Sequence, residues 1–456
     1  MPKQNDYDRL SAHPDAAIIL ASDLTGPLKF EPELARVGTL PVLLRAILGV
    51  QSTRPARIIV VSNTISGPRI RRELLSTQRL PGQVEWMNVA TSTTLSSIVL
   101  QVAADGDRLL VVAGDRTYNP RLHRIVSVWD EKSGALELAS GDDPVGLFAL
   151  SRETSMKLAA DSGSNVVTPQ GLHRWITDNA TAVDCRQVEK NLWQKISTPE
   201  DGIAAEQKLN EWLVKPTDGI FARMNRRVSI PISRQIARFP ITPNMVSLFT
   251  LGVSFASGVL FALGGYWETL AGAILSVWAS ILDGCDGEVA RLKLQASDFG
   301  TWLETFCDYL YYLFMFAGMA IGLARSKGDP VYLTWGVALF FGAITTFFIA
   351  SLSRKGLSGK HPDQFLAVWQ RKAERRLSNP LLYVGRYTEF IIRRCFLPYA
   401  ILAFSLVNLT QVALYMSAVG ANLAWIISLY SYVVFSSKSG AVARIDATSK
   451  TKPIKA

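Results

Sequence analysis

Hydrophobic and polar residues are distributed differently in the two parts of this 456-residue chain. Up to about residue 240, charged residues interrupt short apolar runs, whereas from Asn244 to about Phe435 long apolar stretches recur with few charges between them. A helix needs about 20 apolar residues to cross the hydrocarbon core of a bilayer. The pattern therefore predicts a soluble first part and a membrane-embedded second part.

The second part contains six apolar stretches that we interpret as membrane spans. They lie at residues 244–264, 267–290, 299–324, 331–352, 395–411 and 413–436. The fifth is the weakest of the six, because it is short and contains Pro398. We expect an all-α membrane domain with six transmembrane helices over residues 244–436.

The placement of Lys and Arg predicts how these spans are oriented. Basic residues are concentrated in the connection at 353–394 and in the tail at 437–456. Because cytoplasmic loops carry an excess of Lys and Arg, we expect both regions and both termini in the cytoplasm. In a bacterium the membrane would be the inner or plasma membrane. Arg325 and Lys327 run against this rule but are outnumbered. The polar N-terminus has no apolar secretory region, which agrees with a cytosolic first domain.

The net charge of +10 is explained by the basic residues that flank the spans. Attraction to anionic lipid accounts for their placement, so we expect membrane lipids as partners and no nucleic acid. The four cysteines form no CxxC pair. A cytosolic or membrane setting keeps thiols reduced, and we expect these cysteines to be packing residues.

The first part, which follows a polar tail at residues 1–13, alternates short β-rich runs with amphipathic stretches over residues 14–200. This alternation predicts an α/β domain with a mostly parallel sheet. Ligands of such sheets bind at the carboxyl ends of the strands, which makes Asp115 a candidate site residue. The expected strands are 16–22, 56–63 and 107–115, and the expected helices are 40–50 and 67–80.

The blocks "AAIILAS", "VGTLPVLLRAILGV", "RLLVVAGDRTYNPRLHRIV" and "VGLFALSRE" resemble sugar-phosphate nucleotidyltransferases. Those enzymes hold a triphosphate with a glycine-rich, basic loop after the first strand. This chain keeps Gly26 but lacks the other loop glycines and the loop arginine, and Thr39 stands close to where the family has a lysine. The resemblance implies that Asp115 is a metal ligand. We expect a degenerate domain with a scaffolding or regulatory role; an active domain that makes a CDP-alcohol from CTP is the alternative.

Residues 201–243 connect the two parts and mix arginines with apolar residues. This composition predicts a linker and an amphipathic helix in the membrane interface, with its charged face toward lipid headgroups or a phosphorylated substrate. Pro243 and Asn244 mark the start of the next helix.

Four carboxylates interrupt the second and third spans, namely Asp283, Asp286, Glu304 and Asp308. A charge at bilayer depth costs at least about 3 kcal/mol, so such residues indicate a function. Within each pair the spacing is three or four residues, which places its members on one helix face. If the connection "RLKLQAS" turns the chain back, the two pairs converge. Their hard oxygen atoms suit Mg²⁺, Mn²⁺ or Ca²⁺.

A metal held by carboxylates alone indicates phosphate chemistry. Arg291 is placed to pair with a phosphate, and a spare carboxylate can deprotonate an acceptor hydroxyl. Intramembrane ion pairs, a cation or proton transporter and an inactive membrane scaffold are the competing interpretations.

The same window resembles the signature of the CDP-alcohol phosphotransferase family, D-x2-D-G-x2-A-R followed by G-x3-D-x3-D. The chain departs from the signature at Glu304, where the family has Asp. Glu keeps the charge but adds a methylene group, and we expect the site to have adjusted to it. The positions that match are Asp283, Asp286, Gly287, Ala290, Arg291, Gly300 and Asp308.

The resemblance implies transfer of a phospho-alcohol group from a CDP-alcohol donor to an alcohol or lipid acceptor, with release of CMP. It implies that one or two Mg²⁺ or Mn²⁺ ions are bound by Asp283, Asp286, Glu304 and Asp308, with Asp308 also the general base. It further implies substrate-binding positions at Gly287, Ala290, Arg291, Gly300 and Asn244.

The order of the two parts resembles bifunctional enzymes that make CDP-inositol and join it to inositol phosphate. We therefore expect inositol-phosphate chemistry or phospholipid synthesis, with a lipid acceptor or a CDP-diacylglycerol donor left open. Members of the family often pair as homodimers.

Overall fold

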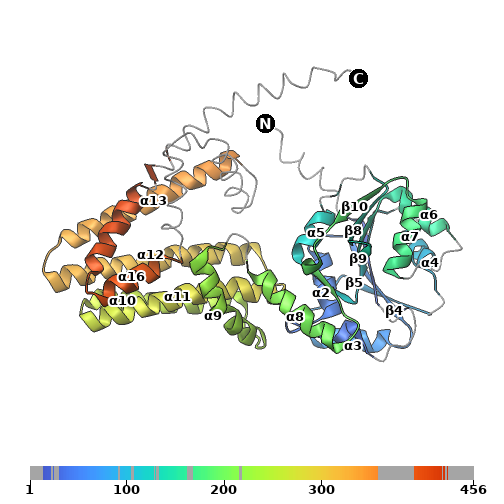
Figure 1. Ribbon diagram of the computed structural model, residues 1–456, viewed down its shortest axis with the longest axis horizontal. Coiled ribbons are helices and arrows are strands. Elements are labelled where there is room, and N and C mark those ends of the chain that lie inside the picture. The colour runs from blue at the N-terminus through green and yellow to red at the C-terminus, as the bar shows by residue number, and fades with distance from the viewer. Residues whose placement is uncertain are drawn as a thin grey trace, which may run out of the picture. The chain divides into compact units, whose positions relative to one another are not determined.

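The chain divides into two compact units (Figure 1). The first comprises Met1–Pro216, Arg234–Pro240 and Glu288–Gln295, and the second comprises the remaining residues. The computed structural model describes residues 14–21, 24, 30–90, 93–103, 107–127, 129, 133–161, 168–214, 218–357, 395–423, 425–426 and 429.

A seven-stranded sheet of order β10-β8-β9-β6-β1-β4-β5 forms the centre of the first unit. Adjacent strands are parallel except where β9 pairs with β6 and β8. The strands are β1 (Ala16–Leu20), β4 (Arg57–Asn63), β5 (Val84–Val89), β6 (Leu109–Ala113), β8 (Ala135–Ser140), β9 (Asp143–Leu150) and β10 (Val183–Gln187).

Helices cover both faces of this sheet (Figure 1). Alternate residues of β1 face two separate apolar cores: Ile19 packs with residues of α2, α3 and α5, and Ile18 packs with residues of α4, α6 and α7. Strands buried on both faces read as continuous apolar runs, which explains "AAIIL". The helices are α2 (Val42–Gln51), α3 (Gly67–Ser76), α4 (Leu95–Val102), α5 (Pro120–Ser127), α6 (Arg152–Ala160), α7 (Pro169–Asn179) and α8 (Pro199–Leu213).

The described residues of the first unit also form short strands and 3₁₀ turns. The strand pairs are β2 (Arg36–Val37) with β3 (Leu40–Pro41), and β7 (Arg116–Tyr118) with β11 (Trp193–Lys195). The turns are η2 (Pro32–Leu34) and η3 (Lys190–Leu192).

The predicted mostly parallel α/β fold of the first part is confirmed. The three expected strands correspond to β1, β4 and β6, whereas β5 was not predicted. The expected helix at 67–80 ends at Ser76. Most of the loop after β1, including Gly26, lies outside the described residues.

The described part of the second unit is helical. Its helices are α9 (Ile220–Ala237), α10 (Pro243–Leu263), α11 (Tyr266–Lys293), α12 (Asp298–Lys327), α13 (Val331–Leu357) and α16 (Leu397–Leu406), followed by helical residues 410–423. The last residues of α9 and of α11 are assigned to the first unit.

Among the described residues, α10, α11 and α12 are long and apolar enough to cross a membrane. Val331–Thr346 and Leu397–Leu406 are shorter apolar helical stretches. The first three predicted spans therefore correspond to three candidate spans. Residues 353–357 are described only as backbone, and the rest of the basic connection to 394 and the C-terminal tail lie outside the described residues.

Helices α10 and α12 approach each other closely at glycines. A Cβ atom built on Gly318 would meet the carbonyl oxygen of Gly258, and one on Gly322 would meet that of Phe261. Small residues let helix backbones come close together in a membrane. This contact fixes α12, which carries Glu304 and Asp308, against α10.

Candidate active site

Helix α10 starts where the proline predicted it, with Pro243 in its first turn. The backbone N–H of Met245 donates to Oγ1 of the N-cap residue Thr242 at 3.4 Å. Such a cap satisfies an otherwise unpaired donor at the helix N-terminus. It holds the start of the helix on which Asn244 and Ser247 lie.

Helices α11 and α12 are joined by a four-residue connection and run antiparallel. Ser276, early on α11, meets the hydroxyl of Tyr311, further along α12, at 2.8 Å. Asp283 and Asp308 line a common pocket nearer to the connection. The turn expected at "RLKLQAS" therefore brings Asp308 of α12 to the same pocket as Asp283 and Asp286 of α11.

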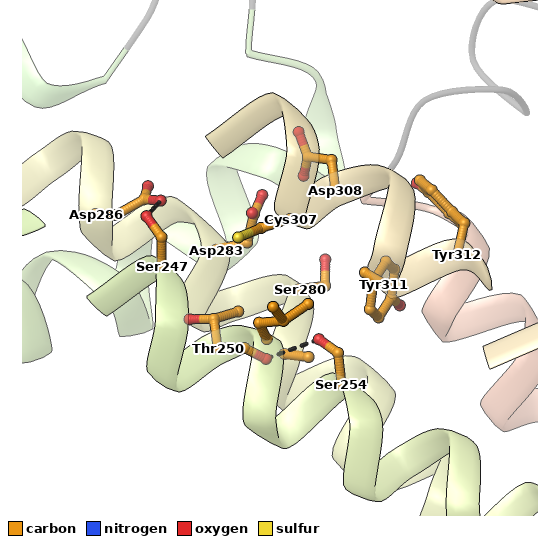
Figure 2. Close-up of a pocket in the computed structure, with 12 residues that line it drawn as sticks. Ser247, Thr250, Ser254, Ser280, Asp283, Asp286, Cys307, Asp308, Tyr311 and Tyr312 are labelled. Carbon is orange, nitrogen blue, oxygen red and sulfur yellow. Dashed lines mark hydrogen bonds between the residues drawn. The ribbon is translucent and has the colours of Figure 1, made fainter. Parts of the chain in front are cut away.

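The pocket lies between α10, α11 and α12 and has a cavity volume of about 20 Å³. A site of about 10–15 Å³ is enough for one water molecule, so this cavity has room for a small ion or a single hydroxyl group. Figure 2 shows its polar side chains. Its lining is Ser247, Thr250, Leu251, Ser254, Ala279, Ser280, Asp283, Asp286, Cys307, Asp308, Tyr311 and Tyr312.

Asp286 is the carboxylate with the best-defined partners. It is buried, and the hydroxyl of Ser247 donates to its Oδ2 at 2.5 Å (Figure 2). A hydrogen bond to an ionised acceptor is about twice as strong as one between neutral groups. Ser247 therefore holds Oδ2 of Asp286 in place, while Oδ1 accepts from the backbone N–H of Gly287.

The hydroxyl groups of α10 were not foreseen as part of this site. Ser247, Thr250 and Ser254 follow one another at helical spacing, and all three are buried. Ser254 donates to the Thr250 carbonyl oxygen at 2.7 Å. The signal in the sequence was this row of small polar residues on one face of an apolar helix.

The chemistry of the pocket fits a hard divalent cation, although its carboxylates are not gathered around one point. Within the described part of the chain, no three His, Cys, Asp or Glu side chains form a group that could hold a metal as they stand. The Oγ1 atom of Thr250 is buried there without a hydrogen-bond partner among the described residues. Carboxylate and hydroxyl oxygens are the ligand types that Mg²⁺ and Mn²⁺ prefer.

Glu304 lies half-buried one turn before Asp308 and outside the pocket lining. It is nevertheless within electrostatic range of Asp286, as is Asp283. Glu304, the one departure from the family signature, is therefore also the one of the four carboxylates that does not line the pocket.

Two of the predicted substrate-binding residues lie side by side. A Cβ atom built on Gly300 would lie 3.3 Å from Oδ1 of Asn244 and 3.1 Å from Oγ of Ser297. The absence of a side chain at Gly300 therefore leaves space for the Asn244 amide at the start of α10.

The other three predicted substrate-binding residues, Gly287, Ala290 and Arg291, follow Asp286 on α11 and do not line the pocket. The Gly287 N–H contacts Oδ1 of Asp286 at 2.5 Å. Arg291 is half-buried and donates through Nη2 to the Leu213 carbonyl oxygen at 3.3 Å, a contact inside the first unit.

Helix α9 packs on the part of α11 that carries the first two carboxylates. Arg226 pairs with Asp218 at 3.2 Å and donates to the Gly284 carbonyl oxygen at 3.2 Å. A Cβ atom on Gly284 would lie 2.9 Å from Nη1 of Arg226. The arginine that the sequence assigned to headgroups or substrate therefore has a structural contact next to Asp283.

Asp115 lies at the carboxyl end of β6, as expected, and is buried. Its Oδ1 pairs with Nε of Arg116 at 3.2 Å. The Arg116 side chain is 1% exposed, donates to the Pro144 carbonyl oxygen at 2.6 Å and lies 5.3 Å from the Trp193 ring centre. A guanidinium group thus balances the charge that a metal ion would otherwise balance.

The part of the chain that forms the pocket matches a known protein family. Residues 240–368 match the family model described as CDP-alcohol phosphatidyltransferase. This stretch is a CDP-alcohol phosphatidyltransferase domain. It contains the four carboxylates, the glycines and Arg291, so the resemblance of the sequence motif to this family is confirmed.

The transferase domain has similar relatives in bacteria. The chain is 32% identical over 189 residues to the bifunctional IPC transferase and DIPP synthase of Aquifex aeolicus, covering 41% of each protein. It is 29% identical over 150 residues to the phosphatidylinositol phosphate synthase of Mycobacterium tuberculosis, covering 31% of this chain and 67% of that protein. The chain spans about two fifths of the length of the curated relatives that it matches first.

A solved structure, the inositol-1-phosphate CTP transferase from T. maritima, is similar over 43% of this chain and 96% of its own, with 12% identity and a TM-score of 0.34.

Proposed function

We propose that the chain is an integral membrane transferase that moves a phospho-alcohol group from a CDP-alcohol to an acceptor alcohol and releases CMP. The observation that supports this most is the pocket in which Asp283 and Asp286 of α11 face Asp308 of α12, inside the matched transferase domain. Neither a scaffold nor a simple packing role requires three acidic side chains in one cavity between apolar helices.

In this proposal the cation is Mg²⁺ or Mn²⁺, as one or two ions, held by Asp283, Asp286, Glu304 and Asp308. When bound, it would supply positive charge next to the donor's diphosphate. Ser247 keeps Asp286 oriented through the 2.5 Å hydrogen bond. Asn244, Gly287, Ala290, Arg291 and Gly300 are the proposed contacts of the cytidine diphosphate portion.

Asp308 is the proposed general base. It is buried in the pocket lining, where a carboxylate can accept the proton of the acceptor hydroxyl. The acceptor oxygen then forms a bond to the phosphorus that carries the alcohol group, and the bond from that phosphorus to the oxygen of CMP breaks. The cavity of about 20 Å³ has room for the reacting hydroxyl, and in this proposal the nucleotide lies outside it.

The proposed topology has six membrane spans over residues 244–436 and cytoplasmic termini. Three candidate spans and the shorter apolar stretches of α13 and α16 support it. In the proposed organisation, a polar tail (1–13), a cytosolic α/β domain (14–200) and a linker with an interfacial helix (201–243) precede the membrane domain, and a basic tail (437–456) follows it. A homodimer belongs to the same proposal.

We propose inositol phosphate as the acceptor alcohol, with a phospholipid alcohol as the alternative acceptor. Similarity to a phosphatidylinositol phosphate synthase supports this choice. Two other similar relatives are bifunctional IPC transferase and DIPP synthases. This similarity supports the bifunctional alternative better than an enzyme whose first domain is degenerate. We therefore include in the proposal that the α/β domain makes the CDP-alcohol from CTP.

The experiment is CMP release by the purified protein in detergent, with a panel of CDP-alcohols, inositol phosphate as acceptor, and Mg²⁺ or Mn²⁺. We expect release with at least one donor, loss of release on chelation, and recovery when metal is added back. An absence of CMP from every donor, with or without metal, would leave the scaffold or transporter interpretation.

The α/β domain is tested separately with CTP and inositol phosphate. We expect pyrophosphate release, and its loss in Asp115→Asn, because Asp115 is the proposed metal ligand. In Arg116→Gln the carboxylate loses its counter-charge, and we expect tighter binding of Mn²⁺. If the wild-type protein releases no pyrophosphate, the α/β domain is degenerate. The CMP assay still tests the transferase domain, because its CDP-alcohol donors are supplied directly.

A further inference from the structure

A chain of hydrogen bonds joins three helices at the wall of the transferase pocket. Tyr399 of α16 donates to Oδ1 of Asn225 on α9 at 2.6 Å. Nδ2 of the same amide donates to Oγ of Ser280 on α11 at 3.4 Å. Ser280 lines the pocket three residues before Asp283 (Figure 2).

The directions of these hydrogen bonds determine what Ser280 can do. A hydroxyl group has one proton to donate and two lone pairs to accept. Because Ser280 accepts from Asn225, its own proton is left for a partner elsewhere. Asn225 is only 6% exposed, so its amide has to be satisfied by such neighbours, and Tyr399 fixes which end of the amide faces Ser280.

Helix α9 is well placed to hold this arrangement. Further contacts join it to the following turn of α11, where Arg226 donates to the Gly284 carbonyl and Ser233 donates to the Cys285 carbonyl at 3.5 Å. These contacts hold the backbone of α9, and with it Asn225, against α11.

We propose that Asn225 and Tyr399 are positioning residues that orient the Ser280 hydroxyl toward the oxygen of the acceptor alcohol. This inference rests on the proposed function. Ser280 and Asp308 line the same cavity, which has room for one hydroxyl group. Ser280 donates to the acceptor oxygen while Asp308 takes the proton from it, so the site selects an acceptor that presents a hydroxyl at this position.

The test measures kcat and KM for donor and acceptor separately in the whole protein. In Ser280→Ala, we expect the acceptor KM to rise about threefold to tenfold, as for loss of one hydrogen bond, with an unchanged donor KM. Asn225→Leu and Tyr399→Phe should show the same pattern, and Ser280→Thr should restore most of the affinity.

The double variant Ser280→Ala/Tyr399→Phe decides whether the tyrosine acts through the serine. We expect its acceptor KM to equal that of Ser280→Ala alone, because Tyr399 acts only through the Ser280 hydroxyl, which this variant already lacks. Additive effects, or equal changes in donor and acceptor KM, would overturn the proposal.

Matched controls are available on α10 and α11. Ser257→Ala removes another buried hydroxyl, which donates to the Gly272 carbonyl at 2.7 Å, and Tyr266→Phe removes a tyrosine contact to the Leu406 carbonyl at 3.1 Å. Neither residue lines the pocket, and neither variant should change the acceptor KM. If the wild-type protein is active and Ser280→Ala has the same acceptor KM, the positioning role of Asn225, Tyr399 and Ser280 is refuted. If the wild-type protein is inactive, the proposed function itself is refuted.

Discussion

Individual carboxylates of the transferase domain are held in different ways. Asp286 is buried and accepts a hydrogen bond from Ser247, whereas Glu304 lies half-buried outside the pocket lining. In the proposed site, the Glu304 side chain, which is one methylene group longer, extends further toward the pocket than Asp at this position could. We therefore expect the native site to be adjusted to Glu.

The variant Glu304→Asp tests this adjustment. Shortening the side chain withdraws the carboxylate by about 1.5 Å, and a misplacement of about 1 Å can cost up to about 100-fold in rate. We expect CMP release to fall about tenfold, with a weaker dependence on Mg²⁺. Glu268→Asp, at the other end of α11, is the control and should retain the wild-type rate. An increase in rate for Glu304→Asp would instead mean that the native site is compromised.

A single histidine makes the stability of the α/β unit depend on pH. His123 is buried beside Tyr118, and burial lowers its pKa from 6.5 to about 4. The folded unit keeps the imidazole neutral, while the unfolded chain takes up a proton below its ordinary pKa. The contribution of His123 to the free energy of unfolding is therefore fully present above about pH 6.5. It decreases as the pH falls toward 4, by about 1.4 kcal/mol per pH unit at most.

We expect the variant His123→Phe to remove this contribution. Urea unfolding of the whole protein is monitored by the protease sensitivity of the α/β unit. The free energy of unfolding should decrease more steeply between pH 6.5 and 4 in the wild type than in the variant. Parallel pH profiles for the two proteins would contradict the assignment.

At the scale of elements, the packing of α10 on α12 depends on small residues. A Cβ atom on Gly318 would overlap the Gly258 carbonyl oxygen, whereas nothing lies within 4 Å of one on Gly252. The substitution Gly318→Ala therefore forces α10 and α12 apart, and we expect a loss of about 1–3 kcal/mol and reduced CMP release. Gly252→Ala is the matched control and should be neutral or slightly stabilising. Thermal unfolding in detergent measures both, and equal melting temperatures would refute the close contact.

The elements that the sequence predicted best are those with a strong local signal. Continuous apolar runs marked β1, β4 and β6, and long apolar stretches marked α10, α11 and α12, because burial on several sides requires such runs. The antiparallel placement of β9 was not predictable, since strand pairing joins residues far apart in the chain. The end of α16 at Leu406 was missed although a local signal was present, because Asn408 adopts φ of +55° and Asn is one of the residues that end helices in this conformation.

At the scale of the whole molecule, the site was predicted in part. The spacing of Asp283, Asp286, Glu304 and Asp308 indicated a shared site, because helical periodicity and one tight turn are enough to bring them together. The hydroxyl groups of α10 and the amide of Asn225 were not assigned to it, since they come from other helices. Only the packing of α9, α10 and α11 brings them to the pocket or its wall.

The two units carry separate proposed activities, and the transferase activity is the central claim. Its most direct test is the rate of CMP release, at saturating donor, acceptor and Mg²⁺, by the wild-type protein and by Asp308→Asn. Asp329→Asn, which alters a carboxylate in the connection between α12 and α13, is the control. We predict at least a 100-fold loss, roughly the contribution of a general base, in Asp308→Asn alone. Release that persists at the wild-type rate in Asp308→Asn would contradict the account.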